Sequence, residues 1–136
     1  METLQAALAN AHGLWRYVVL ITAGLAIGKS LIGWLERREW QVVDERIAVY
    51  FIMAVDIGVT LGVLVWLLET RWNGTDVLRS WRHPATMLVA AGAVHVGWIR
   101  AKAAPTATGR FARCTLFFAI AGVIILAGVL QIQGTF

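Results

Sequence analysis

Three histidines and a few charged residues interrupt a strongly apolar chain, and they are the residues that could carry chemistry. His12 and Arg16 are one helical turn apart and so share a helix face. His83 directly precedes Pro84, a residue suited to the first turn of a helix. Two imidazoles at matched depth on different helices could bind one metal ion or both faces of one haem iron, and Arg16 could hold a haem propionate or a quinone carbonyl. The alternative is a pair of interfacial histidines hydrogen-bonded to water or lipid headgroups.

A second polar group, Lys29, Asp56 and His95, falls deeper in the apolar segments. At 1.5 Å per residue these residues lie roughly 7 to 13 Å from the inner ends of their helices, so the three could meet. Asp56 is too deep to reach water, and we expect it to be buried and paired with Lys29 or His95. Such a cluster would be a proton path or an ion site, or else a structural ion pair. His95 lies about 18 Å along a helix from His83, so the two cannot bind the same iron.

The rest of the chain has the composition of a membrane protein. Of its 136 residues, 59% are hydrophobic and 15% charged, against roughly 45–50% and about 25% in soluble domains. We predict an all-α fold in a single domain, residues 1–136: an up-down-up-down bundle of four transmembrane helices. The expected spans are residues 14–35, 47–68, 84–100 and 111–130. Such spans leave no room for a soluble catalytic domain.

Charged and small residues predict how these helices are oriented and packed. More basic residues flank one side of the spans than the other, so that side is expected to be cytoplasmic and both termini outside. The larger set is Arg37, Arg38, Arg46, Arg100, Lys102, Arg110 and Arg113, and the smaller is Arg16, Arg71, Arg79 and Arg82. The formal charge of +4 therefore does not indicate nucleic-acid binding. Glycines four apart, Gly24 with Gly28 and Gly58 with Gly62, predict close helix contacts.

Several enzyme classes are disfavoured by what the sequence lacks. The single cysteine, Cys114, rules out an intrachain disulfide and a multi-cysteine metal site. There is no nucleophile paired with a base, no glycine-rich phosphate loop and no zinc-ligand spacing. Hydrolysis and phosphoryl transfer are therefore not expected.

Short motifs at the predicted helix starts resemble those of a group of small bacterial four-helix membrane proteins labelled cytochrome-b-like. The motifs are His12-Gly13-Leu14-Trp15-Arg16-Tyr17, Asp44-Glu45-Arg46 and His83-Pro84-Ala85-Thr86-Met87. The resemblance implies a bacterial inner-membrane location and functional roles for His12, Arg16 and His83. The chain departs from the group at Asp56, where the pattern looks more like glutamine, and at His95, which is peculiar to this sequence.

Three functions fit these observations. The first is a small b-type-cytochrome-like or quinone-interacting subunit of an electron-transfer complex, with haem b at His12 and His83 and with the lipid bilayer and other membrane subunits as partners. The second is a cofactor-free accessory subunit that stabilises a larger respiratory or photosynthetic complex. The third, a small transporter with Asp56 as its coupling residue, ranks last. Four-helix exporters normally carry an acidic residue in the first helix, where this chain has Lys29.

Overall fold

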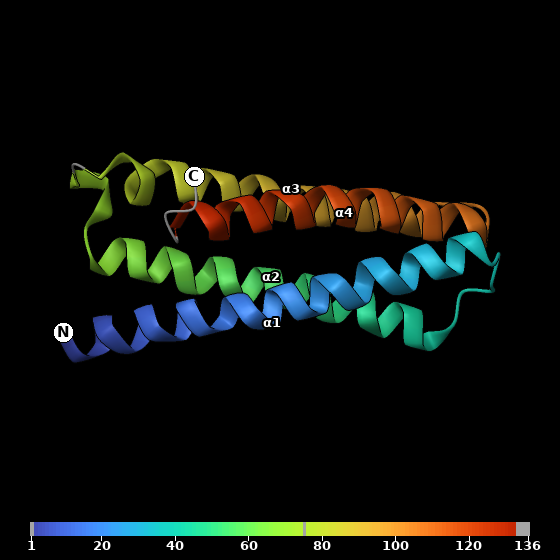
Figure 1. Cartoon of the computed structure of the whole chain (residues 1–136), viewed down its shortest axis with the longest axis horizontal. Coiled ribbons are helices and arrows are strands. Elements are labelled where there is room, and N and C mark those ends of the chain that lie inside the picture. The colour runs from blue at the N-terminus through green and yellow to red at the C-terminus, as the bar shows by residue number, and fades with distance from the viewer. Residues whose placement is uncertain (1, 75, 133–136) are drawn as a thin grey trace.

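The computed structural model describes residues 2–74 and 76–132, and helices make up most of that length. Within it, four long helices lie side by side (Figure 1): α1 (Glu2–Leu35), α2 (Val42–Leu68), α3 (His83–Lys102) and α4 (Ala107–Ile132). Two short helical turns, η1 (Arg71–Asn73) and η2 (Leu78–Arg82), join α2 to α3. The described residues contain no strand, so the predicted all-α fold class is confirmed.

Local interactions account for several helix ends. α1 stops where Arg37 adopts a left-handed conformation with φ 54°, and the Arg38 N–H turns back to the Gly33 carbonyl at 3.0 Å. α2 starts after Gln41, whose backbone N–H donates to Asp44 Oδ2 at 2.8 Å. Pro84 lies in the first turn of α3, which follows directly on η2 because the backbone stays helical through Arg82 and His83. The end of α1 and the start of α2 are therefore encoded close by in the sequence.

Consecutive helices meet in opposite sequence order, so they run antiparallel (Figure 1). Near one end of the α1–α2 pair, Gln5 Nε2 donates to the Leu68 carbonyl at 2.7 Å. Near the other end, Lys29 Nζ lies 3.1 Å from Asp44 Oδ1. A hydrogen bond also joins α3 to α4. Arg113 of α4 donates to the Arg100 carbonyl near the end of α3 at 2.7 Å. In this register Lys29 is level with Asp44.

The core is closed by aromatic and very small side chains. Phe51 of α2 and Phe118 of α4 meet edge to face with ring centroids 5.2 Å apart. Alanines make up half of the other residues in the core and allow the helix backbones to approach closely. α1 and α3 lie diagonally across the bundle, and α2 and α3 make the fewest contacts of the four adjacent pairs.

The two predicted glycine pairs have different outcomes. Gly58 and Gly62 face α1, where a Cβ on Gly58 would meet the Trp15 ring at 3.2 Å and one on Gly62 would meet the His12 ring at 3.0 Å. This pair does allow close contact, as expected. Gly24 and Gly28 have no neighbour within 4 Å of where a Cβ would be, so the prediction of close packing there was wrong.

Three of the helices, α1, α2 and α4, are long and apolar enough to cross a membrane. α3 is shorter, and its two histidines, Arg100 and Lys102 lower its mean hydropathy. Much of its outward face is nevertheless apolar, since Leu88, Val89 and Ile99 are 56 to 68% exposed. The exposed side of α3 also carries His95, whose side chain is 48% exposed.

Candidate functional site

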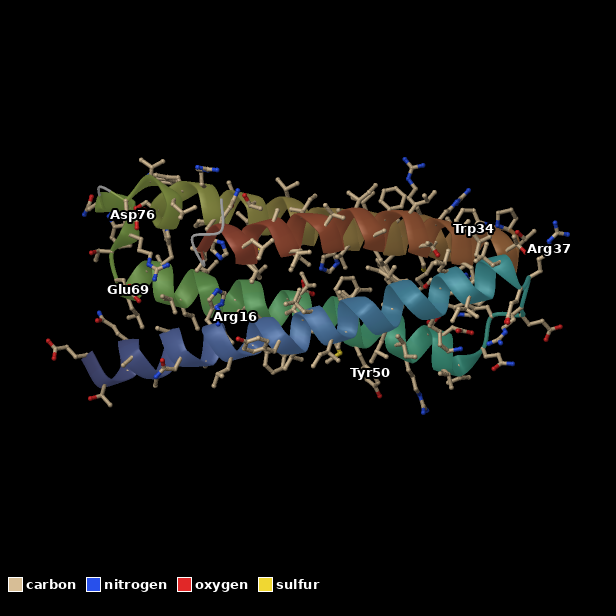
Figure 2. All side chains as sticks on the ribbon, viewed as in Figure 1. Arg16, Trp34, Arg37, Tyr50, Glu69 and Asp76 are labelled. Carbon is tan, nitrogen blue, oxygen red and sulfur yellow. The ribbon has the colours of Figure 1, made fainter. Side chains whose placement is uncertain are left out.

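A cavity of about 510 Å³ lies inside the bundle, toward the end that holds η1 and η2. Its lining is mostly apolar, and the polar side chains among the described residues around it are His12, Arg16, Arg71, Ser80 and His83. A mostly apolar cavity of a few hundred Å³ with a few convergent polar groups is the usual form of a small-molecule site. In Figure 2, Arg16 lies on α1, toward the same end of the bundle as Glu69. The three residues predicted for the outer site, His12, Arg16 and His83, all line this one cavity.

His12 and His83 approach each other across this cavity from the two diagonal helices. Their ring centroids are 6.3 Å apart, and the ring planes are nearly perpendicular at 83°. His12 Nδ1 lies 3.0 Å from the Gly58 carbonyl oxygen. In the tautomer that places its proton on Nδ1, His12 donates this hydrogen bond and keeps Nε2 as a lone-pair donor. A backbone carbonyl of this kind is the usual orienting partner of a histidine that ligates a metal.

The separation of the two rings fits a shared metal. Nitrogen–metal bonds of about 2 Å, plus roughly 1 Å from each nitrogen to its ring centre, put two opposed imidazoles about 6 Å apart. Among the described residues, no group of three or more His, Cys, Asp and Glu side chains could hold a bare metal ion. A haem requires only two axial ligands from the protein, because its porphyrin supplies the other four nitrogens. The donor set therefore fits a haem better than a bare ion.

Two arginines, Arg16 and Arg71, could bind the acidic groups of such a ligand. Arg16 Nε is buried and has no hydrogen-bond partner among the described residues. Its Nη2 donates to the Tyr17 hydroxyl at 3.2 Å, and the guanidinium carbon lies over the Tyr17 ring, 5.0 Å from the ring centroid. Arg71 lines the cavity and pairs with Glu69 at 3.1 Å. A buried guanidinium N–H without an acceptor is costly, and a carboxylate in the cavity would satisfy it.

The inner polar residues do not form one cluster. Lys29 Nζ lies 3.1 Å from Asp44 Oδ1, so Lys29 pairs with Asp44 and not with Asp56. Asp56 Oδ1 lies 2.7 Å from His95 Nε2, so the predicted pairing of Asp56 is confirmed with His95 and not with Lys29. α1 extends past the start of α2, so the residue level with Lys29 is Asp44, and Asp56 lies twelve residues, or about 18 Å, further along α2.

The expectation that Asp56 is buried was also wrong. The Asp56 and His95 side chains are each 48% exposed, because they lie on the outward faces of α2 and α3. Asp44, by contrast, is only 7% exposed. Depth along a helix can be counted from sequence, but the face that a residue presents depends on how the helix is rotated in the bundle.

No protein-family profile matches the chain, and no curated protein or solved structure matches it significantly. The resemblance carried by the motifs at His12 and His83 therefore stays a prediction.

Sequence reasoning missed several residues that shape the cavity. Trp66 donates from Nε1 to the Ser80 carbonyl at 2.7 Å and packs against Trp81 with ring centroids 5.7 Å apart, so residues of the α2–α3 connection line one end of the cavity. Trp15 donates to the Ala54 carbonyl at 2.7 Å and forms part of the α1 wall. Arg71 comes from η1, which follows the left-handed turn at Thr70, φ 49°. In the sequence these residues look like ordinary interfacial aromatics and topology-setting charges.

Proposed function

We propose that this protein is a small b-type-cytochrome-like membrane subunit of an electron-transfer complex, with haem b held between His12 and His83. The observation that carries the proposal is the 6.3 Å separation of the two imidazole rings across a mostly apolar cavity. Histidine is one of the side chains through which proteins hold haem iron.

A membrane location forms part of the proposal. The four helices would cross a bacterial inner membrane as an up-down-up-down bundle, with both termini outside and with other membrane subunits as partners. Three helices are long and apolar enough for this. α3 would be the fourth span, since much of its exposed face is apolar and its charged residues Arg100 and Lys102 lie in its last turn. The exposed His95 would be partnered there by Asp56. Basic side chains at that position can extend to the interface.

The side chains around the cavity would bind and orient the cofactor. His12 and His83 would hold the haem through their imidazole nitrogens, with the Gly58 carbonyl fixing the orientation of the His12 ring. Arg16 and Arg71, which both line the cavity, would neutralise propionates. The tryptophans at the end of the cavity would exclude water. When bound, the haem supplies reversible one-electron chemistry, whose potential depends on its axial ligands and on burial.

The alternative, a cofactor-free accessory subunit, accounts for the small size and the apolar composition equally well. It gives no reason for two histidine rings to approach each other across a cavity, or for Arg16 Nε to be buried without an acceptor. The cofactor-binding proposal accounts for both.

The test is an absorbance spectrum of the protein purified in mild detergent without a stripping step, before and after dithionite. We expect a Soret band and reduced α and β bands. His12→Ala and His83→Ala should each abolish or shift the Soret band, whereas His95→Ala, the matched histidine variant outside the cavity, should leave it unchanged. A wild-type protein without haem that copurifies stoichiometrically with a larger complex would instead establish the accessory role.

A further inference from the structure

We infer that Asp56 and His95 form a binding site for the headgroup of a lipid-soluble quinone or quinol, at the outward seam between α2 and α3. This inference rests on the proposed membrane location and electron-transfer role. It assigns a site to the ligand class that such a subunit would exchange electrons with, and it uses residues outside the cavity.

The first support is the position of the pair. Asp56 lies near the middle of α2, and both side chains are 48% exposed on the outside of the bundle. Exposed apolar residues lie around them, among them Met53, Ile57 and Ile99. Thr60, one turn along α2, is also exposed, and its hydroxyl donates to the Asp56 backbone carbonyl at 2.8 Å. In a bilayer this surface would face the acyl chains near mid-depth, where a bare ionisable pair is costly. A ligand that reached it would have to come from the lipid and carry a polar group.

The second support is the unused hydrogen-bonding capacity of the pair. His95 Nε2 and Asp56 Oδ1 engage each other at 2.7 Å. Within the described residues, no further hydrogen bond involves Asp56 Oδ2 or His95 Nδ1. These two atoms can accept the hydroxyl hydrogen of a quinol, and a protonated His95 can donate to a quinone carbonyl. The pair therefore suits both redox forms of the headgroup.

The third support is the distance to the cavity. Gly62, which lies against the His12 ring, is six residues beyond Asp56 on α2, or about 9 Å along the helix. Val63 and Leu88 line the cavity and are also exposed on α2 and α3. The helices α2 and α3 therefore carry both the proposed quinone site at Asp56 and His95 and part of the cavity wall. A ligand at Asp56 would lie close to the proposed haem without entering its cavity.

The experiment measures binding of decylubiquinone to the full-length protein in lipid nanodiscs, by quenching of tryptophan fluorescence. Trp98, three residues after His95 and stacked near Trp40, provides a reporter on α3. An azido derivative of the same quinone then locates the site by photolabelling and mass spectrometry. We expect saturable binding and labels within residues 50–63 and 88–100.

Asp56→Asn and His95→Gln should each weaken binding about tenfold or more, as expected for the loss of a hydrogen bond to a charged or strongly polar group. Thr22→Val, which removes a polar group from α1 away from the seam, should bind as the wild type does. Helical circular dichroism of all three variants should equal that of the wild type.

The inference would be overturned if the quinone showed no saturable binding. It would also be overturned if Asp56→Asn and His95→Gln both left the binding unchanged. Dimeric protein in the nanodiscs that Asp56→Asn dissociates would also overturn it, because a second copy would then cover the pair. The Soret band of the same samples separates the two proposals. If quinone binding depends on Asp56 and His95 but the samples contain no haem, only the haem assignment is contradicted. If the Soret band is normal but quinone binding does not depend on Asp56 and His95, only the quinone site is contradicted.

Discussion

Single residues set how closely the helices approach. Gly97 of α3 is buried, and the ring-bearing Cβ of Phe117 on α4 occupies the space that a Gly97 side chain would need. Gly92 of the same helix is exposed and has no neighbour within 4 Å of where a Cβ would be. The two glycines thus share a helix and differ only in what they face.

Gly97→Ala should therefore destabilise the protein, while Gly92→Ala should not. The obstructing atom is next to the α4 backbone and cannot rotate away, so the helices must separate, at a cost of about 1 to 3 kcal/mol. Gly92→Ala adds a methyl group in open space, and because alanine favours the helix over glycine, the variant should be as stable as the wild type or slightly more stable. Reversible unfolding in mixed micelles, followed by circular dichroism, measures both variants. Equal stabilities would mean that α3 and α4 do not pack in this register.

At the level of elements, the α1–α2 pair is held in register by contacts spread over its whole length. His12 lies against Gly62 near one end, and the Lys29–Asp44 ion pair lies near the other. Asp44 is buried and its second oxygen caps α2 through the Gln41 N–H, whereas the Lys29 side chain is 31% exposed. The pair thus ties the end of one helix to the start of the next.

A double-mutant cycle with Lys29→Met and Asp44→Asn should be non-additive. Lys29→Met alone leaves a buried carboxylate without its cation, whereas the asparagine in the double variant carries no charge and keeps an oxygen for the Gln41 N–H. A coupling of about 0.5 to 3 kcal/mol is typical of residues in direct contact. The control cycle, Lys29→Met with Asp56→Asn, should be additive because these residues are about 18 Å apart along the bundle. Coupling in the control alone would favour the original Lys29–Asp56 pairing.

The whole molecule has an uneven distribution of basic residues between its two ends. The residues around the α1–α2 and α3–α4 connections include Arg37, Arg38, Arg46, Lys102 and Arg110. Fewer basic residues lie at the end with η1 and η2. Because basic loops are retained in the cytoplasm, this difference predicts the orientation of an inserted bundle.

Alkaline phosphatase fused after the C-terminal Phe136 should be active, and the same enzyme fused after Arg38 should be inactive. This enzyme folds only outside the cytoplasm, so the pair of fusions reports both sides of the membrane. Green fluorescent protein at the same two positions provides the reciprocal measurement. The reverse pattern would show that the predicted topology is inverted. If both phosphatase fusions were active, α1 would not cross the membrane as predicted.

The sequence by itself determined the helical class and the set of polar residues worth attention. Composition requires long apolar helices, and Pro84 and Asp44 mark helix starts through local backbone chemistry. It also put His12 and His83 at the starts of two segments that enter from one end, although their contact at 6.3 Å depended on which helices lie diagonally.

Only the tertiary structure decided which polar groups meet. Residue number multiplied by the helical rise gives depth within one helix, but the relative sliding and rotation of two helices come from packing, here from small residues such as Gly58 and Gly62. That packing set Lys29 beside Asp44 and turned Asp56 and His95 outward. It also brought Arg71 to the cavity from a connecting turn whose path no periodic pattern encodes.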